Sequence, residues 1–455
     1  MNIKTITAVF ATAVWAMTSQ AATPQVTAVS MTQPGPTRLV NIAYTLDNAP
    51  AVVTLDVQTN YTEGGMTKWA SIGGQAVCNA QGDVWKKVGT SGTFNGSITW
   101  RPDQSWPDHV ITDNGARAVV TAWALDNTPD YMVVDISEGA QQNTQKYYTS
   151  TNCLPGGLFG NPDYRTTKLV MRKIMAKDVE WTMGSTSMET QRDGSPKEAT
   201  HTVTLTNNYY IGVFEITQAQ WALIQTSYAQ PSYYNNAAYR AMRPVEQVSY
   251  NEIRVSANSQ YTAGGGFWPR DPNEGSFLGL LYTRTGIKFD LPSEAQWEFA
   301  ARAGNGDTRW GDGSAILNSN EDGNMTRLGR YQFNGGGSSG NRPAADSDGT
   351  AGTAIVGSYA PNNWGLYDMF GNVQEWCLDF YEADITSYGG KVNVKLSNPE
   401  QNLSGATTER IIRGGCCLRA AAQCRPARRS SENATTRSST YDLIGFRVVC
   451  TAGLQ

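Results

Sequence analysis

The sequence contains very little histidine. Only His109 and His201 are present, so one chain cannot supply the three histidine ligands of common zinc hydrolases and multi-histidine iron sites. The chain also has no large excess of charge of either sign. It contains 36 lysines and arginines and 40 aspartates and glutamates, which give a formal net charge of −4. This balance predicts no nucleic-acid partner and no acidic membrane surface as a partner. Arg425, Arg428 and Arg429 form a local basic cluster, which pairing with buried carboxylates explains equally well.

The chain also lacks apolar runs long enough to cross a bilayer. The apolar run at residues 6–17 follows Lys4 and precedes the small-x-small sequence Ser19-Gln20-Ala21. These features predict a secretory signal peptide over residues 1–21, no membrane span, and an exported protein, periplasmic or extracellular. Disulfides persist in such compartments, and an odd count of seven cysteines leaves at least one thiol free or shared between molecules.

The first half of the mature chain is predicted to be β-rich. Segments such as AVVTLDVQTN (51–60) and ARAVVTAWALDN (116–127) alternate apolar and polar residues and end in residues that favour turns. We therefore expect an antiparallel β-sandwich of immunoglobulin-like type over residues 22–136, acting as a spacer or adhesion module. Residues 137–167 have no periodicity and many Gly, Asn and Thr residues, so we expect a linker there.

Residues 168–455 are predicted to form a separate, loop-rich α+β domain. The clearest helix lies in LPSEAQWEFAARAG (291–304), where Ser293 is the expected N-cap and Gln296 completes a capping box. Thr217 is a second expected N-cap. Residues 305–363 show little periodicity, which in a compact domain indicates a functional loop, disorder or a bound ion.

The segment GLYDMFGNVQEW carries candidate calcium ligands. Asp368, Gly371, Val373 and Glu375 are spaced so that two carboxylates and the intervening backbone carbonyls can face one point. Oxygen ligands from a tight, glycine-containing loop suit calcium. Two nearby carboxylates can also cap a turn or pair with arginines, and the sequence leaves both interpretations open.

A second candidate segment, RGGCCLRAAAQC, contains Cys416, Cys417 and Cys424. Cysteines clustered in this way form a disulfide, bind a soft metal, act as a nucleophile or pack as small buried side chains. If the segment is a strand, Cys416 and Cys417 point to opposite faces, so only one of them can act together with Cys424.

Several motifs together resemble the formylglycine-generating enzyme family, also called sulfatase-modifying factors. MGS, HTVTL, YYIGVFEITQAQW, RPVEQVSYNE, LPSEAQWEFAARAG, GLYDMFGNVQEW, RIIRGG and LIGFRVV follow one another between residues 168 and 449. The resemblance implies a loop-rich variant of the C-type-lectin-like fold with two calcium ions. It assigns the four residues of GLYDMFGNVQEW named above to one ion. It assigns Asp348 and the Thr350 carbonyl to the second, where Arg330 replaces the expected asparagine.

The resemblance also implies a chemistry. The best-known family members oxidise one cysteine of a sulfatase to formylglycine, with oxygen and a copper(I) ion held by two cysteines. When the family pattern is aligned from Gly415, its second copper cysteine corresponds to Cys424. Its first copper cysteine corresponds to Arg419, which cannot bind copper. Cys424 therefore has three interpretations: a relocated copper site with Cys416 or Cys417, a disulfide with one of them, or a buried thiol. The exported compartment favours the disulfide.

Two classes of function follow from these residues. The favoured one is a diverged, exported family member without efficient cysteine oxidation, which serves as a calcium-stabilised binding module for a polypeptide or surface ligand. The alternative is an active oxidase that converts a sulfatase cysteine to formylglycine with copper(I) on Cys424 and either Cys416 or Cys417. Arg419 favours the first class. Iron-dependent sulfoxide synthases of the same fold are excluded because their histidines are missing.

Overall fold

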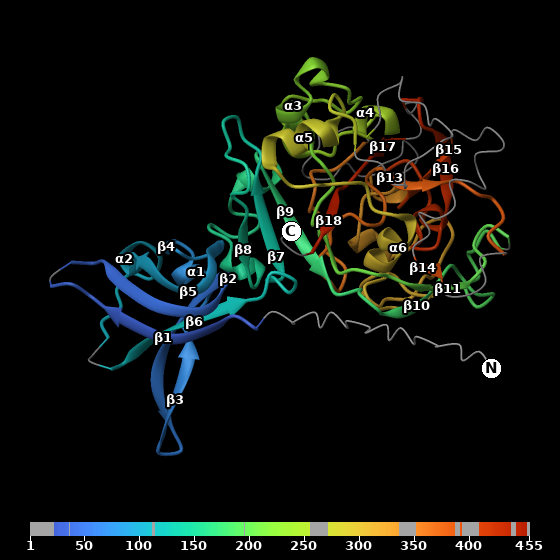
Figure 1. The fold of residues 1–455 in the computed structure, drawn as a ribbon. Helices are drawn as coiled ribbons and strands as arrows, with labels where there is room; N and C mark the ends of the chain where they lie inside the picture. The colour runs from blue at the N-terminus through green and yellow to red at the C-terminus, as the bar shows by residue number, and fades with distance from the viewer. Residues whose placement is uncertain are drawn as a thin grey trace, which may run out of the picture.

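The computed structural model describes residues 22–35, 37–111, 114–194, 196–254, 272–335, 352–386, 392–393, 409–437 and 443–452. Figure 1 shows a smaller, β-rich N-terminal part beside a larger, loop-rich C-terminal part, with strands β7, β8 and β9 lying between them. Within these residues, none of the helices has both the length and the apolar character needed to cross a membrane.

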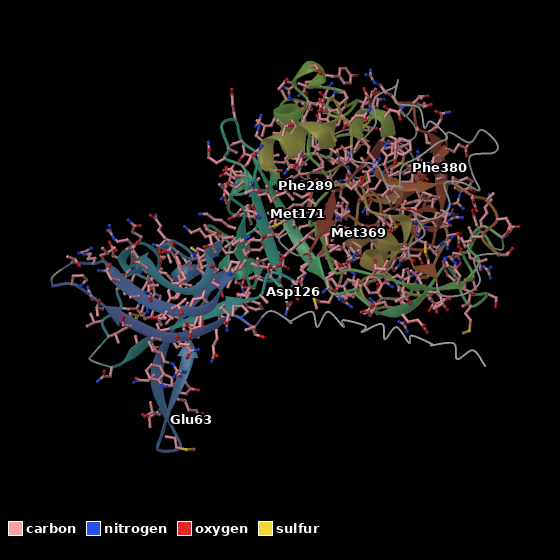
Figure 2. All side chains as sticks on the ribbon, in the orientation of Figure 1. Glu63, Asp126, Met171, Phe289, Met369 and Phe380 are labelled. Atoms are coloured by element: carbon pink, nitrogen blue, oxygen red, sulfur yellow. The ribbon has the colours of Figure 1, made fainter. Side chains whose placement is uncertain are left out.

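The N-terminal part is built on one six-stranded antiparallel sheet. Its strands are β1 (Gln25–Thr32), β2 (Val40–Glu63), β3 (Met66–Ser71), β4 (Gln81–Gly82), β5 (Lys87–Trp100) and β6 (Ala116–Trp123). Strand β2 pairs with four of the others and bends where its register to β5 shifts near Ala49, next to Asn48 at a φ of 59°. The short helices α1 (Gly74–Val77) and α2 (Pro102–Ser105) lie near β4 and β5. The end of β2 and β3 form a projecting hairpin with Glu63 at its tip (Figures 1 and 2).

The predicted immunoglobulin-like sandwich is not confirmed, because these strands form a single hydrogen-bonded sheet. Strand β7 (Tyr131–Asp135), which the sequence places in the sandwich, pairs with β9 (Lys168–Ile174) of the C-terminal part. It belongs to a five-stranded sheet in the order β18-β12-β9-β7-β8, completed by β8 (Lys146–Tyr148), β12 (Tyr209–Gly212) and β18 (Val449–Thr451). The predicted boundary near residue 136 therefore separates strands that share a sheet.

Residues 137–167, predicted as a linker, are part of the packed structure. They contain β8 and two short 3-10 helices, and Leu154 and Tyr164 are buried in the same cluster as Trp85 of the first sheet. The ring of Trp85 stacks on Tyr148 of β8 with the centroids 5.3 Å apart. An apolar sheet face that is exposed to water is unfavourable. Here residues 137–167, rather than a second sheet of the N-terminal part, cover the apolar face of the six-stranded sheet.

The described residues of the C-terminal part form two further small sheets and four α-helices. One sheet joins β10 (Glu180–Met183), β11 (His201–Thr204) and β14 (Val392–Asn393), and the other has the order β16-β15-β13-β17. The strands of the latter are β13 (Gln374–Phe380), β15 (Glu409–Arg413), β16 (Ser430–Asn433) and β17 (Ile444–Gly445). The helices are α3 (Gln218–Ile224), α4 (Tyr250–Arg254), α5 (Phe277–Thr285) and α6 (Glu294–Arg302). The described chain is therefore α+β, with little regular structure.

The two predicted helix caps are confirmed. Thr217 caps α3 and Ser293 caps α6, each with a reciprocal bond from the glutamine three residues later. Helix α6 packs Trp297 into the core near Met369, which Figure 2 places inside the C-terminal part. This packing positions α6 beside the two candidate segments.

Candidate functional site

The two candidate segments lie side by side. The acidic loop (residues 368–375) leads into β13, and the cysteine segment (residues 414–424) leaves β15, its antiparallel neighbour. The Gly371 N–H donates to the Gly414 carbonyl at 2.8 Å, and the Cys417 N–H donates to the Asn372 carbonyl at 2.9 Å. Sheet pairing and these bonds therefore bring together residues that the sequence analysis treated separately.

Glycine makes the tight turn of the cysteine segment possible. Gly415 has a φ of 66°, and a Cβ added there would lie 2.5 Å from the Cys424 sulfur and 2.7 Å from the Gln423 carbonyl oxygen. Only a residue without a side chain accepts this approach. The turn returns Cys424, at the end of a 3-10 helix, to the start of the segment.

All seven cysteines lie among the described residues, and all carry free thiols, so the predicted disulfide to Cys424 is not formed in the structure. Cys416, Cys417 and Cys424 are fully buried. Cys416 lies within electrostatic reach of the other two thiols. Cys416 and Cys417 follow the end of β15 and share one apolar cluster with Val373, so the strand argument for opposite faces does not apply.

Burial keeps these thiols protonated. It raises the pKa of Cys416 above its usual value, and it raises the pKa of both Cys417 and Cys424 well above that value. The positive charge of Arg419 lowers the pKa of Cys416 and Cys424 but does not reverse the effect of burial. Copper(I) binds thiolates. As they stand, two neutral thiols beside a guanidinium do not fit that ion.

The acidic loop is wound tightly around the backbone of Arg330. Asp368 and Asn372 both have a φ of 57°, and a Cβ on Gly371 would lie 2.2 Å from the Arg330 carbonyl oxygen. The buried Asp368 accepts a bond of 2.6 Å from the Gly357 N–H. The loop geometry therefore depends on one glycine and on two residues in the left-handed region.

Glu375 is held by an arginine. Both of its carboxylate oxygens accept bonds from the Arg447 guanidinium at 2.6–2.9 Å, and Trp297 Nε1 donates to one of them at 2.9 Å. All three side chains are fully buried. Pairing with an arginine was one of the two interpretations that the sequence left open for this carboxylate.

Glu215 joins this cluster, and the sequence analysis missed it. Its carboxylate accepts bonds from Asn372 Nδ2 at 2.7 Å and from the Val373 N–H at 3.2 Å. Burial, and then the charges of Asp368 and Glu375, raise the pKa of Glu215 well above its usual value, although Arg447 opposes them. The available signal was a single glutamate directly after the apolar run YYIGVF.

The cluster meets some requirements of a calcium site. Three buried carboxylates and neighbouring carbonyls provide oxygen donors, and their surplus of negative charge favours a proton or a cation. Glu375 would have to share its oxygens between the ion and Arg447. Within the described residues, no group of three or more His, Cys, Asp or Glu side chains is arranged to hold a metal. Backbone carbonyls, such as those of Gly371 and Val373, would have to complete the coordination.

Asp348 and Thr350, the residues predicted for a second calcium, lie outside the described residues. Arg330, which replaces the expected asparagine, is described and fully buried. Its guanidinium donates to the carbonyl oxygens of Gly352 at 3.1 Å and Asn334 at 2.9 Å. Arg330 therefore places a fixed positive charge beside these two carbonyl oxygens, and this charge would repel a metal ion bound next to it.

Two of the three arginines in the basic cluster near Cys424 pair with buried carboxylates, whereas the third, Arg428, pairs with the part-exposed Asp193. Arg425 donates to Glu189 and Glu198, and Arg429 donates to Glu294 at 2.7 and 3.0 Å. These side chains are buried, so they provide no basic surface for a partner.

Comparison with known proteins supports the resemblance. Residues 165–452 match the family described as "Sulfatase-modifying factor enzyme 1-like domain". The chain belongs to this family. It is 34% identical over 162 residues to a formylglycine-generating enzyme of Thermomonospora curvata, covering 34% of this chain and 48% of that enzyme. It is 27% identical over 281 residues to "Serine/threonine-protein kinase pkn1" of Chlamydia pneumoniae, covering 61% of this chain and 38% of that protein. The chain thus spans half or less of the length of these relatives.

Two solved structures are similar to part of the chain. "Treponema denticola variable protein 1" is 25% identical with a TM-score of 0.43, covering 63% of this chain and 96% of that one. PvdO from Pseudomonas aeruginosa is 21% identical with a TM-score of 0.44, covering 62% and 94%.

The family motifs meet in space as buried ion pairs. Glu375 of GNVQEW binds Arg447 of LIGFRVV, and Arg413 of RIIRGG donates to Glu298 of EAQWEFAARAG. The motifs that identify the family therefore also hold together segments that are distant in sequence.

Proposed function

We propose that this chain is a diverged, exported member of the family that serves as a binding module for a polypeptide or surface ligand and makes little or no formylglycine. The observation that carries the proposal is Arg419. It stands where the family pattern has the first copper cysteine, and its charge acts on Cys416 and Cys424. The expected export rests on the signal-like residues 1–21.

The argument against oxidation is electrostatic. A two-thiolate copper(I) site needs both sulfurs deprotonated, whereas burial raises the pKa of Cys416 and Cys424. A nearby guanidinium stabilises thiolates, but it also repels the cation that the thiolates would bind. Arg419 therefore cannot replace the missing ligand.

Calcium is the second element of the proposal. Asp368, Glu375 and the carbonyls of Gly371 and Val373 would hold the ion, with Glu215 close by. The ion would supply positive charge to a cluster in which carboxylates raise the pKa of Glu215. Because the loop bonds to the cysteine segment, an ion there would stiffen both segments.

The alternative is an active oxidase, and one observation favours it. Cys416 and Cys424 lie within electrostatic reach of each other, and the Cys424 sulfur lies against Gly415, so two thiols are available in one place. In this alternative both would have to lose their protons.

The test combines copper(I) titration of the reduced protein with an assay on a sulfatase-type peptide containing Cys-x-Pro-x-Arg. Wild type is compared with Arg419→Cys, and Arg309→Cys is the control because Arg309 is exposed and its variant adds a thiol away from the segment. We expect weak copper binding and no formylglycine from wild type and Arg309→Cys, and tighter copper binding by Arg419→Cys. Turnover by wild type at an ordinary enzymatic rate, about one per second or faster, would establish the oxidase instead.

A further inference from the structure

Two cysteines outside both candidate segments lie close together. Cys78 directly follows helix α1, and Cys153 is the last residue of a 3-10 helix (Thr151–Cys153) in the segment that covers the first sheet. The two helices pack against each other. The Cys153 sulfur lies against Gly74, the first residue of α1, where an added Cβ would be only 2.6 Å from it. Cys78 follows Gly74 by about one helical turn, so it lies on the same side of the helix.

The side chain of Gln75 connects the surroundings of the two cysteines. Its Nε2 donates to the carbonyl oxygens of Asn152 at 2.8 Å and Leu154 at 2.7 Å, which are the residues on either side of Cys153. Its Oε1 accepts a bond from the Cys78 thiol at 3.9 Å. One amide group therefore contacts the Cys78 sulfur and both neighbours of Cys153. In agreement with this, the two thiols lie within electrostatic reach of each other.

The two thiols differ in their access to solvent. All seven cysteines are described, and Cys78 is the only one of them that is not buried. Cys153 is buried, and the hydroxyl oxygens of Thr149 and Ser150 lie 3.4 and 3.5 Å from its sulfur. A reagent in solution can therefore reach Cys78 first, whereas Cys153 can react only with a group that Cys78 already carries.

We propose that Cys78 and Cys153 form a disulfide by exchange with a small disulfide oxidant. The Cys78 sulfur, after losing its proton, attacks one sulfur of the oxidant, and the other sulfur leaves and takes up a proton. The Cys153 sulfur, after losing its proton, attacks the Cys78 sulfur of this mixed disulfide and displaces the rest of the oxidant as a second thiol. Two protein thiols lose two electrons and two protons, and one oxidant disulfide becomes two thiols.

The bond would fasten two parts of the chain to each other. Cys78 belongs to the part built on the six-stranded sheet, and Cys153 belongs to the segment that leads into β9 of the five-stranded sheet. A disulfide between positions so far apart in sequence restricts the unfolded chain and stabilises the folded one. The pair shares no residue with the cysteine segment or the acidic loop, so this inference goes beyond the proposed function and is independent of it.

The test treats the intact, reduced protein with oxidised glutathione and maps its unreduced tryptic peptides by mass spectrometry. Trypsin releases Cys78 in the peptide 69–86 and Cys153 in the peptide 147–165, each with no other cysteine. We expect these two peptides to be linked and the number of free thiols to fall by two. The melting temperature should rise by at least about 4 °C, and dithiothreitol should reverse both changes.

Two variants identify the roles of the thiols. Cys153→Ser should retain glutathione on Cys78 and show no such rise in melting temperature. Cys450→Ala is the matched control, because it removes a buried thiol elsewhere, and it should still give the linked peptides. Folded wild type that retains glutathione on Cys78, keeps all of its thiols free or links a different pair of cysteines overturns the proposal. Linked peptides without a rise in melting temperature overturn the stabilising role of the bond.

Discussion

The buried pair between Arg447 and Glu375 allows a sharp test of what holds the candidate site together. Arg447 is fully buried, and its guanidinium donates to both carboxylate oxygens of Glu375. It also donates to the backbone carbonyls of Gly212 and Tyr367, at 3.0 Å in both cases. Arg447→Met keeps an unbranched apolar side chain in place of the aliphatic part of arginine but removes the charge and every one of these bonds. Glu375 would then be left with the bond from Trp297 alone among the partners described above.

The expected cost is large. Removing one partner of a buried ion pair costs about 3–5 kcal/mol, because the remaining charge stays buried without compensation. For a domain of this size each kcal/mol lowers the melting temperature by about 2–4 °C, so Arg447→Met should lower it by roughly 6–20 °C. The negative charge of Asp368 nearby adds to this cost.

Thermal unfolding followed by circular dichroism measures the effect. Arg309→Met is the control, since Arg309 is exposed, and it should change the melting temperature by less than about 2 °C. The double variant Arg447→Met/Glu375→Gln should recover a large part of the loss, because no uncompensated charge remains at Glu375. A melting temperature for Arg447→Met within about 2 °C of wild type would refute the reasoning and show that another cation balances Glu375.

Three further outcomes are expected. If calcium binds the acidic loop, excess chelator should lower the melting temperature and elemental analysis should find calcium, since a ligand of the folded state stabilises it; no shift and no metal would contradict the site. A thiol reagent should modify only the half-buried Cys78 in the native protein, and all seven cysteines after denaturation. A count of five reactive thiols in the denatured, unreduced protein would instead reveal one disulfide. Burial raises the pKa of Glu246 to about 7, so the folded state binds more protons than the unfolded state between about pH 4.5 and 7. Glu246 should therefore contribute a fall in stability of roughly 3 kcal/mol as pH rises through this window. Glu246→Gln should remove this contribution and leave those of Glu189 and Asp379, because burial raises the pKa of each of them to about 7 as well.

Local features of the fold could be predicted from the sequence. Thr217 and Ser293 cap their helices as expected, because a cap depends on residues within one turn. The alternation in β2 correctly predicted extended structure, but it does not specify pairing partners. Strand β7 pairs with β9 rather than with a strand of the first sheet. The pairing partner of a strand depends on which apolar side chains must be buried in the folded protein, and alternation along one strand does not contain that information.

The candidate site also contains some features that the sequence predicted and others that it could not predict. Spacing predicted that Asp368 and Glu375 face one cluster, and the acidic loop does bring their charges close to Glu215. The partner of Glu375 could not be predicted, since Arg447 lies far along the chain and is brought close only by the parallel pairing of β13 with β17. The free thiols could not be predicted either, because burial is a property of the packed core.

The buried ion pairs also help to decide whether the presence of the family motifs is evidence for cysteine oxidation. Glu375 with Arg447, and Glu298 with Arg413, join strands and helices that are distant in sequence, and losing one partner of such a pair costs several kcal/mol. Any chain that keeps this fold therefore has a structural reason to keep these residues, whatever it does with cysteine. A shared fold does not imply a shared reaction. The residue that separates the two functions is Arg419, because it lies on the segment that would have to hold the copper ion.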